Sequence, residues 1–204
     1  MKRKIIKILG FVLIILLCFY LSYITIGNPV YEKDNSIKQS ILGEIMDGTV
    51  ITQEFTTDQK EISGVKLRFA TYGHILTGNI EFSLSYADNG EVLSNRVIDT
   101  SKLKDNAMYS IIFEKSIPIE KNQMRVTLKG SGTKPDSSAT VYAFDKKTDN
   151  TTMTMNHGIV EDKTLNMSLL FDTFSYTRWI YLSVVMSLLY CYILFVLKSV
   201  ISKK

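Results

Sequence analysis

The chain has 204 residues, of which 46% are hydrophobic and 22% are charged, and its formal net charge is +4. The charged fraction is too high for a protein with many membrane-spanning helices, and the apolar content is too high for a disordered chain. Because the chain has only 2 cysteines, a small scaffold held together by disulfides is also excluded.

The N-terminal region begins with a basic tail, residues 1–7, followed by residues 8–26, which contain no charged residue. This run of 19 residues is close to the length of about 20 that a helix needs to cross a bilayer. The residues after it lack a small-x-small cleavage pattern, so an uncleaved signal anchor is favoured over a secretory signal peptide. A lipoprotein signal is disfavoured because Leu16 and Leu17 precede Cys18, where a small residue is required. We therefore predict a first transmembrane helix over residues 8–26.

The C-terminal region mirrors this arrangement, with a second uncharged run over residues 179–197 and a basic tail over residues 198–204. Residues 174–178, together with the first aromatic residues of the run, are typical of an aromatic belt at the outer membrane surface. Basic residues flank both runs on their terminal sides, and the positive-inside rule places such flanks in the cytoplasm. The sequence thus predicts a two-pass protein of the cell membrane with cytoplasmic termini and an extracellular central domain.

The basic excess belongs to the membrane edges. The tails and helix edges hold 8 of the 24 Lys and Arg and none of the 20 Asp and Glu, which leaves residues 28–177 with 16 basic and 20 acidic residues, a net charge of −4. A mildly acidic domain does not favour nucleic-acid binding, so no nucleic-acid partner is expected.

Between the two helices, short segments alternate apolar and polar residues and are separated by turn residues, as in Asn89-Gly90. This pattern is typical of antiparallel strands with one buried face. We predict an antiparallel, jelly-roll-like β-sandwich over residues 48–173, preceded by a juxtamembrane connector over residues 27–47. The expected strands lie near residues 49–55, 65–69, 80–86, 91–98, 108–113, 124–128, 141–143, 152–155 and 165–171.

A helical period is indicated at one place in the central segment. Ile37, Ile41 and Ile45 are spaced by four residues, which is the spacing of one helix face. The fold class predicted from the sequence is therefore an all-β ectodomain flanked by two transmembrane helices, with at most a short helix near the membrane.

Several segments of the central domain resemble a known group of domains. They are Gly43-Glu44-Ile45, residues 48–55 with their Gln53-x-Phe55, residues 62–72 and residues 77–84. Over residues 43–144 the chain is similar to the extracytoplasmic β-sandwich domains of bacterial membrane proteins in surface-polysaccharide and glycosyltransferase systems. The resemblance implies a jelly roll with a carbohydrate-facing role at the bacterial envelope. It implies no catalytic residues, because the many-helix catalytic portion that often accompanies such domains is missing here.

A set of aromatic and polar residues on the non-core face of the strands is the candidate glycan-binding site. Aromatic rings stack on the C–H faces of sugars, while arginine and other donors fix the orientation of the hydroxyls. The alternative is that these aromatic residues merely cover the second face of a sheet. The candidate residues are Arg68, Tyr72, His74, Arg125, Tyr142 and Phe144.

Catalytic chemistry has weak support in the sequence. His74 follows a strand in a loop, where a solvated histidine is the usual case, and no zinc-protease or nucleophile-elbow motif is present. Paired carboxylates such as Glu161-Asp162 leave a glycoside hydrolase as an alternative, but surface acids are the default interpretation. We predict a non-enzyme without catalytic residues.

A calcium site at Asp145, Asp149 and Asn150 is a weak alternative, because these residues lack an ordered ladder of ligands. No metal and no cofactor are therefore predicted.

Small residues at multiples of four along both apolar runs predict helix packing, because they let helix backbones approach in lipid. They are Gly10, Cys18 and Ser22 in the first run and Ser183, Ser187 and Cys191 in the second.

The leading functional hypothesis is a membrane-anchored, non-catalytic accessory subunit with a carbohydrate-binding-like jelly roll that assists synthesis, modification or export of cell-envelope polysaccharide. Its expected partners are the lipid bilayer, a membrane protein of a glycan-assembly system and a surface glycan. The first alternative is a protein–protein scaffold of a membrane glycosyltransferase or polymerase complex, and the second is a glycan-active hydrolase.

Overall fold

The structure of the protein, a computed structural model, describes residues 2–30, 36–160 and 162–201. These residues form two compact units, and each is described by itself. One unit is helical and comprises Met1–Thr25 with Asp172–Lys204. The other is a β-sandwich formed by Ile26–Phe171.

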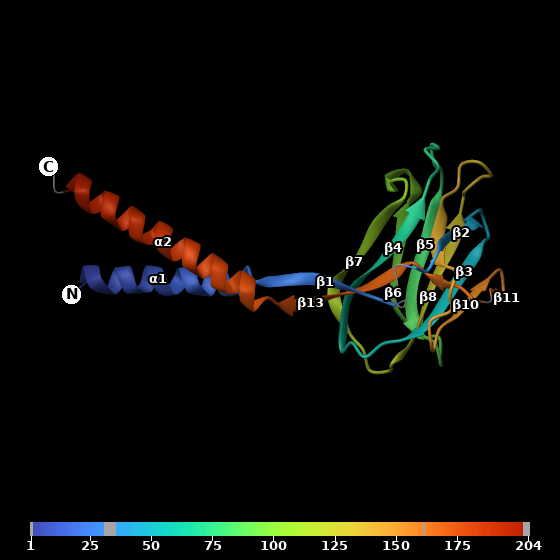
Figure 1. Cartoon of the computed structure of the whole chain (residues 1–204), viewed down its shortest axis with the longest axis horizontal. Coiled ribbons are helices and arrows are strands. Elements are labelled where there is room, and N and C mark those ends of the chain that lie inside the picture. The colour runs from blue at the N-terminus through green and yellow to red at the C-terminus, as the bar shows by residue number, and fades with distance from the viewer. Residues whose placement is uncertain (1, 31–35, 161, 202–204) are drawn as a thin grey trace. The chain divides into compact units, whose positions relative to one another are not determined.

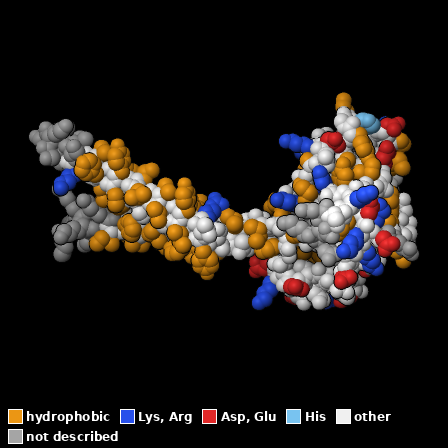
Figure 2. All heavy atoms as spheres, in the orientation of Figure 1, with side chains coloured by type: hydrophobic (Ala, Val, Ile, Leu, Met, Phe, Trp, Pro, Cys, Tyr) orange, Lys and Arg blue, Asp and Glu red, His pale blue; other side chains and the backbone are white. Residues whose placement is uncertain are grey.

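The C-terminal helix α2 (Tyr176–Ile201) is long and apolar enough to cross a membrane. Its segment Tyr176–Val196 has 21 residues and a mean hydropathy of 2.1, and none of it is buried within the protein. At a rise of about 1.5 Å per residue, such a segment matches the about 30 Å of hydrocarbon in a bilayer. Figure 2 shows that hydrophobic side chains cover most of the described surface of the helical unit.

The N-terminal helix α1 (Lys2–Tyr20) ends six residues before the predicted end at residue 26, and its apolar part is only Ile8–Tyr20. The predicted helix over residues 8–26 is wrong at its C-terminal end, because strand β1 (Tyr23–Pro29) begins there and pairs with β13 (Met167–Phe174). The segment Tyr-Ile-Thr-Ile at the start of β1 is aromatic and β-branched, which favours a strand over a helix.

The sandwich consists of two antiparallel sheets, so the prediction of an antiparallel β-sandwich is confirmed. Figure 1 shows the strands of both sheets as arrows. Sheet A follows the order β1, β13, β4 (Glu61–Ala70), β9 (Thr140–Phe144) and β12 (Thr164–Leu165), with β7 (Ala107–Pro118) beside β4 and β2 (Gln39–Glu44) beside β9. Sheet B follows the order β11 (Gly158–Ile159), β10 (Thr152–Met155), β3 (Val50–Thr56), β8 (Gln123–Ser131), β5 (Asn79–Tyr86) and β6 (Val92–Asp99). A short 3-10 helix, η1 (Thr100–Lys102), follows β6.

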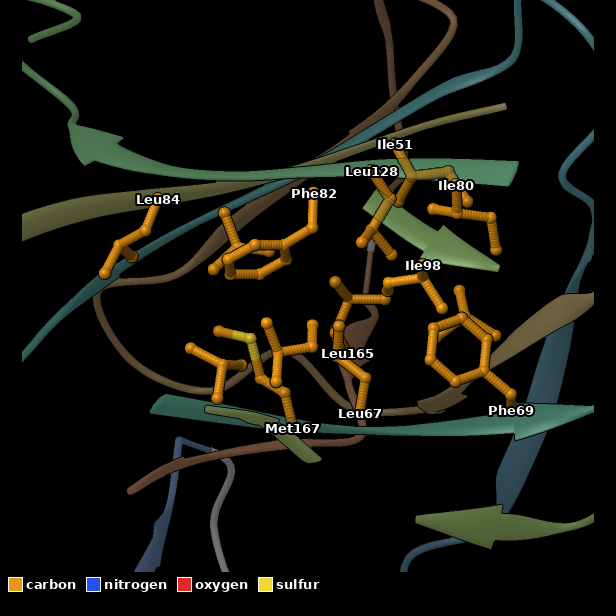
Figure 3. Packing of buried hydrophobic residues seen from close by; sticks show 14 of the residues in the cluster. Ile51, Leu67, Phe69, Ile80, Phe82, Leu84, Ile98, Leu128, Leu165 and Met167 are labelled. Carbon is orange, nitrogen blue, oxygen red and sulfur yellow. The ribbon is translucent and has the colours of Figure 1, made fainter. Parts of the chain in front are cut away.

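Strand alternation determines which side chains enter the core. In β8, Met124, Val126 and Leu128 are fully buried, whereas Arg125 and Thr127 on the other face are only partly covered. The same period-two pattern places the apolar faces of both sheets against one another. Figure 3 shows this core, in which Phe82 and Ile80 of sheet B lie across from Leu67 and Phe69 of sheet A, labelled together with their neighbours.

The connector expected over residues 27–47 contains the last three residues of β1 and all of β2. The helix suggested by the spacing of Ile37, Ile41 and Ile45 does not form, because residues 39–44 are a strand that pairs with β9. Gly43 has a φ of 117° within this strand, where the register with β9 shifts. Such a backbone conformation is accessible mainly to glycine and is incompatible with a helix.

One buried polar side chain joins the two sheets. Gln53 of β3 is fully buried, its Nε2 donates to the carbonyl oxygen of Thr152 at 3.2 Å, and its Oε1 accepts from the backbone N–H of Leu165 at 3.0 Å. Thr152 belongs to sheet B and Leu165 to sheet A. Because a buried amide is costly unless its donors and acceptors are paired, these bonds specify how the two layers align.

Candidate functional site

Three of the six predicted glycan-face residues meet on the outer face of sheet A. The guanidinium carbon of Arg68 in β4 lies 5.0 Å from the ring centroid of Tyr142 in β9, which is cation–π geometry. Arg68 also donates from Nη1 to Oε1 of Gln39 at 2.7 Å. After desolvation, Tyr142 is also one of the groups that raise the pKa of Tyr72. Three of the six residues predicted to share one face are therefore neighbours in the fold.

Tyr72 follows β4 in a left-handed conformation, with a φ of 52°. The carboxylate of Asp105 fixes this turn by accepting the backbone N–H groups of Thr71 at 2.7 Å and of Tyr72 at 2.9 Å. These two hydrogen bonds hold the pKa of Asp105 below its usual value, and the bond from Thr71 has the larger effect. Desolvation raises the pKa of Tyr72, and Tyr142 and Asp105 add to the rise, so the phenol is neutral at physiological pH.

His74 lies next to this cluster, with its ring centroid 6.4 Å from that of Tyr72. Its Nδ1 is 3.1 Å from the carbonyl oxygen of Asp136. In the described part of the chain, His74 is exposed and forms no hydrogen bond or ion pair with a carboxylate. This is the environment of a solvated loop histidine.

Arg125 and Phe144 do not join the cluster, so the six residues do not form one face. Arg125 lies in β8 of sheet B, where its Nε and Nη2 donate to Glu54 Oε1 at 2.9 and 2.6 Å and Nη2 also reaches the carbonyl oxygen of Ala87 at 3.0 Å. Phe144 is 6% exposed and presents no open ring to solvent. Alternation identifies the non-core side of a strand, but it does not identify the sheet that the strand joins.

Apolar side chains surround Arg68 on this side. In the register of the sheet, Met108 of β7 lies beside Arg68, and Ile41 of β2 lies beside Tyr142. Met108 is 43% exposed, Ile41 42% and Tyr72 49%. We call Ile41, Arg68, Tyr72, Met108 and Tyr142 the sheet A patch. Arginine, tyrosine and methionine are enriched at protein–protein interfaces. Arg68 already occupies one face of the Tyr142 ring, so that face is not open for stacking on a sugar.

The outer face of sheet B has a different character. Five residues that share this face follow one another across five neighbouring strands, and we call them the polar row. In strand order they are Thr154 (β10), Thr52 (β3), Thr127 (β8), Ser83 (β5) and Asn95 (β6). The hydroxyl oxygens of Thr52 and Thr154 lie 2.5 Å apart. Within the described residues, the side chains of Thr127, Ser83 and Asn95 have no hydrogen-bond partner in the protein.

Part of the polar row lies in a shallow hollow of about 530 Å³. Its lining includes Ser83, Asn95 and Thr127, with Val97 as an apolar wall. The side chain of Val97 is 67% exposed. The hollow therefore offers unpaired hydrogen-bonding groups beside an apolar surface.

Sequence reasoning missed this face, although a signal was present. Thr52, Thr127 and Ser83 each occupy the polar side of a predicted strand, a position that is typical of any solvent-facing residue. Their alignment into one row depends on the order and register of the strands, which no single strand specifies.

Among the carboxylates considered for metal binding or hydrolysis, Asp145 is already engaged with other side chains. Asp145 accepts from Lys163 Nζ at 2.6 Å and from Ser40 Oγ at 2.5 Å, and these bonds hold the pKa of Asp145 below its usual value. Among the described residues, no three His, Cys, Asp or Glu side chains gather in a way that could hold a metal ion. Glu161 lies outside the described residues, so its pairing with Asp162 is not placed.

The predicted helix-packing residues behave differently in the two helices. A Cβ atom at Gly10 of α1 would lie 2.9 Å from the phenol oxygen of Tyr190 in α2, so glycine allows this contact. Cys18 and Ser22 are buried, and Ser22 Oγ donates to the carbonyl oxygen of Cys18 at 2.5 Å. The other three residues, Ser183, Ser187 and Cys191, line an open hollow on α2.

Comparisons with known proteins provide no family for this chain. No protein-family model matches it, and no curated protein matches it. Among solved structures, an insecticidal delta-endotoxin from Bacillus thuringiensis has 9% identity and a TM-score of 0.34 over 72% of this chain and 24% of its own. A family GH115 4-O-methyl-alpha-glucuronidase with specificity for decorated arabinogalactans has 14% identity and a TM-score of 0.33 over 72% of this chain and 16% of its own.

This chain thus spans about a quarter and about a sixth of the length of those two structures. Similarity at this level is weak, and no functional conclusion for this chain follows from it. The comparisons also provide no link to a membrane polysaccharide system.

Proposed function

We propose that the protein is a membrane-anchored, non-catalytic accessory subunit that binds carbohydrate. Its β-sandwich, with jelly-roll-like connections between the sheets, lies outside the cell and assists synthesis, modification or export of envelope polysaccharide. The observation that supports this function best is the sheet B face, where unpaired Thr127, Ser83 and Asn95 line a hollow beside exposed Val97. Glycans require both kinds of surface, because each sugar has hydroxyls at its edge and C–H groups on its faces.

The membrane anchor in this proposal is the helical unit. The apolar segment Tyr176–Val196 has the length and hydropathy of a spanning helix. The 13 apolar residues Ile8–Tyr20 extend about 20 Å at 1.5 Å per residue, less than the bilayer core, and local thinning of the bilayer and snorkelling of flanking residues accommodate such a mismatch. In this arrangement, residues 1–7 and 198–204 lie in the cytoplasm, because their basic residues follow the positive-inside rule.

Binding of the full chain in lipid nanodiscs to an array of immobilised polysaccharides tests this function. We expect retention on at least one array member by the parent protein and weaker retention by the Ser83→Ala variant. The matched control is Ser110→Ala, which removes an exposed hydroxyl from β7 of sheet A and should leave retention unchanged. Failure of the parent protein to bind any array member would overturn the proposed function.

The sheet A patch favours a second candidate, a scaffold that contacts a membrane glycosyltransferase or polymerase. Its mixture of Arg68, Tyr72, Met108 and exposed isoleucine is typical of the core of a protein interface. A photo-crosslinking residue in place of Met108, compared with one in place of Val97 on sheet B, tests this candidate in native membranes. An adduct with one membrane protein at Met108 and none at Val97 would support the scaffold, and adducts at neither position would oppose it.

A further inference from the structure

The charged side chains around the sheet B face lie in ion pairs, two within sheet B and one with a residue of sheet A. On the outward side of the strands, Glu54 receives two hydrogen bonds from Arg125, the shorter at 2.6 Å, and Lys129 Nζ lies 3.6 Å from Glu81. Arg96, at the edge of the hollow, lies 3.3 Å from Glu114 of β7. Exposed ion pairs contribute little to stability, but each cancels the field that either charge would produce at the polar row.

The uncharged groups on the same face are the ones left unpaired. Thr127, Ser83 and Asn95 make no side-chain hydrogen bond to the described protein, although each offers donors and acceptors. A ligand that meets this face therefore encounters neutral hydrogen-bonding groups at its centre and self-compensated charges on both sides. Both cations that line the hollow, Arg96 and Lys129, are already paired with carboxylates, so an anionic ligand in the hollow would have to compete with Glu114 or Glu81 for them.

The geometry of the polar row sets the direction of a bound chain. Neighbouring strands are about 4.8 Å apart, so five strands place the first and last residues of the row about 19 Å apart. The row crosses the strands at right angles to their direction, because each pair of members is a direct cross-strand pair in the register. Such a row fits an extended chain with repeated hydroxyls better than a compact ligand.

We infer that the ligand of the sheet B face is a neutral, extended glycan that lies across the strands along the polar row. This inference rests on the proposed carbohydrate-binding function and names the class of carbohydrate. Recognition uses hydrogen bonds to Thr127, Ser83 and Asn95 and apolar contact with Val97. Neither the ligand nor the paired charges of the protein surface contribute a net charge. Affinity should therefore depend little on ionic strength.

A matched pair of probes tests the inference directly. Linear oligogalacturonate is an anionic chain, and its fully methyl-esterified form is the same chain without charge. Both are offered to the full-length protein in nanodiscs, beside neutral glucan and galactan oligosaccharides. We expect binding of at least one neutral probe, no tighter binding of the anionic form than of its ester, and less than about a twofold change in Kd between about 50 and about 500 mM NaCl.

Two substitutions locate the binding site. Thr127→Val keeps the β-branched shape while removing the hydroxyl, and Ser83→Ala removes its neighbour in the row. Each should weaken binding of the neutral probe by about two- to tenfold, the effect of one neutral hydrogen bond, whereas Ser110→Ala on sheet A should have no effect. Unchanged thermal midpoints in all three variants would show that the fold is intact.

The possible outcomes separate this inference from the proposed function. Preference for the anionic chain, with binding that weakens as salt rises, would overturn the neutral-glycan inference and leave carbohydrate binding standing. Binding of the neutral probe that is unaffected by Thr127→Val and Ser83→Ala would overturn the assignment to the polar row. Binding of no glycan in the probe set or on the array would overturn the proposed function and the inference with it.

Discussion

At the scale of single residues, the two sheets are aligned by the amide of Gln53. Replacing Gln53 with Met keeps the side-chain volume but removes the amide that bonds to Thr152 and Leu165. The buried N–H of Leu165 is then left without an acceptor. We expect a loss of about 1–3 kcal/mol in the free energy of unfolding and faster hydrogen exchange at the Leu165 amide. Gln123→Met, on an exposed residue of β8, is the control. Equal stability of both variants would show that Gln53 does not join the sheets.

A second residue-scale prediction concerns acid. Backbone N–H groups of Thr71 and Tyr72 stabilise the ionised carboxylate, so the pKa of Asp105 is lower in the folded than in the unfolded state. A lowered pKa contributes stability that is fully present above the unfolded value of about 3.9 and is lost as the pH falls through the folded value. Asp105→Asn should therefore lower the thermal midpoint near neutral pH, and the difference from the parent should shrink below about pH 4. A difference that grows on acidification would contradict this assignment.

At the scale of elements, the loop between β2 and β3 crosses β8 at very close range. A Cβ atom at Gly130 would lie 2.0 Å from the carbonyl oxygen of Met46, so any larger residue must displace backbone. We expect Gly130→Ala to destabilise the sandwich by about 1–3 kcal/mol, measured by chemical unfolding of the full chain. Gly158→Ala is the control, because its Cβ would lie 3.4 Å from the nearest atom, the carbonyl oxygen of Met155. Similar losses in both variants would argue against the close approach.

At this scale, the sequence alone predicts most of the strands but not how they are ordered in the two sheets. Period-two alternation located the strands from β3 to β10 and β13, but not β1 or β2, since burial of residues such as Met124, Val126 and Leu128 is a local property of one strand. It also identified the outward side of each strand, but strand order is a long-range property. For this reason Arg68 and Arg125, which look equivalent in sequence, lie in opposite sheets, while the polar row was not foreseen.

The predicted C-terminal end of the first membrane helix was wrong for a different physical reason. Residues 23–26 are as apolar as a membrane helix, so hydropathy does not distinguish them from residues 8–20. Their β-branched composition and the pairing of β1 with β13 decide the outcome in favour of a strand.

At the scale of the whole molecule, the account predicts a topology. In a variant with Cys18 and Cys191 replaced by alanine, Ser110→Cys should react with a membrane-impermeant maleimide in intact cells, because the proposed orientation places the sandwich outside. Lys198→Cys should react only after the cells are permeabilised. Labelling of Lys198→Cys in intact cells, or protection of Ser110→Cys, would contradict the proposed orientation.

The central claim is that the sheet B face binds carbohydrate. It is tested most directly by titrating the full-length protein in nanodiscs with the neutral polysaccharide fraction of the bacterial cell envelope and comparing the parent with the Ser83→Ala, Thr127→Val double variant. The account predicts saturable binding by the parent and binding about tenfold weaker or more in the double variant, as expected for two lost hydrogen bonds. Equal binding by the two proteins, or none by either, would contradict it.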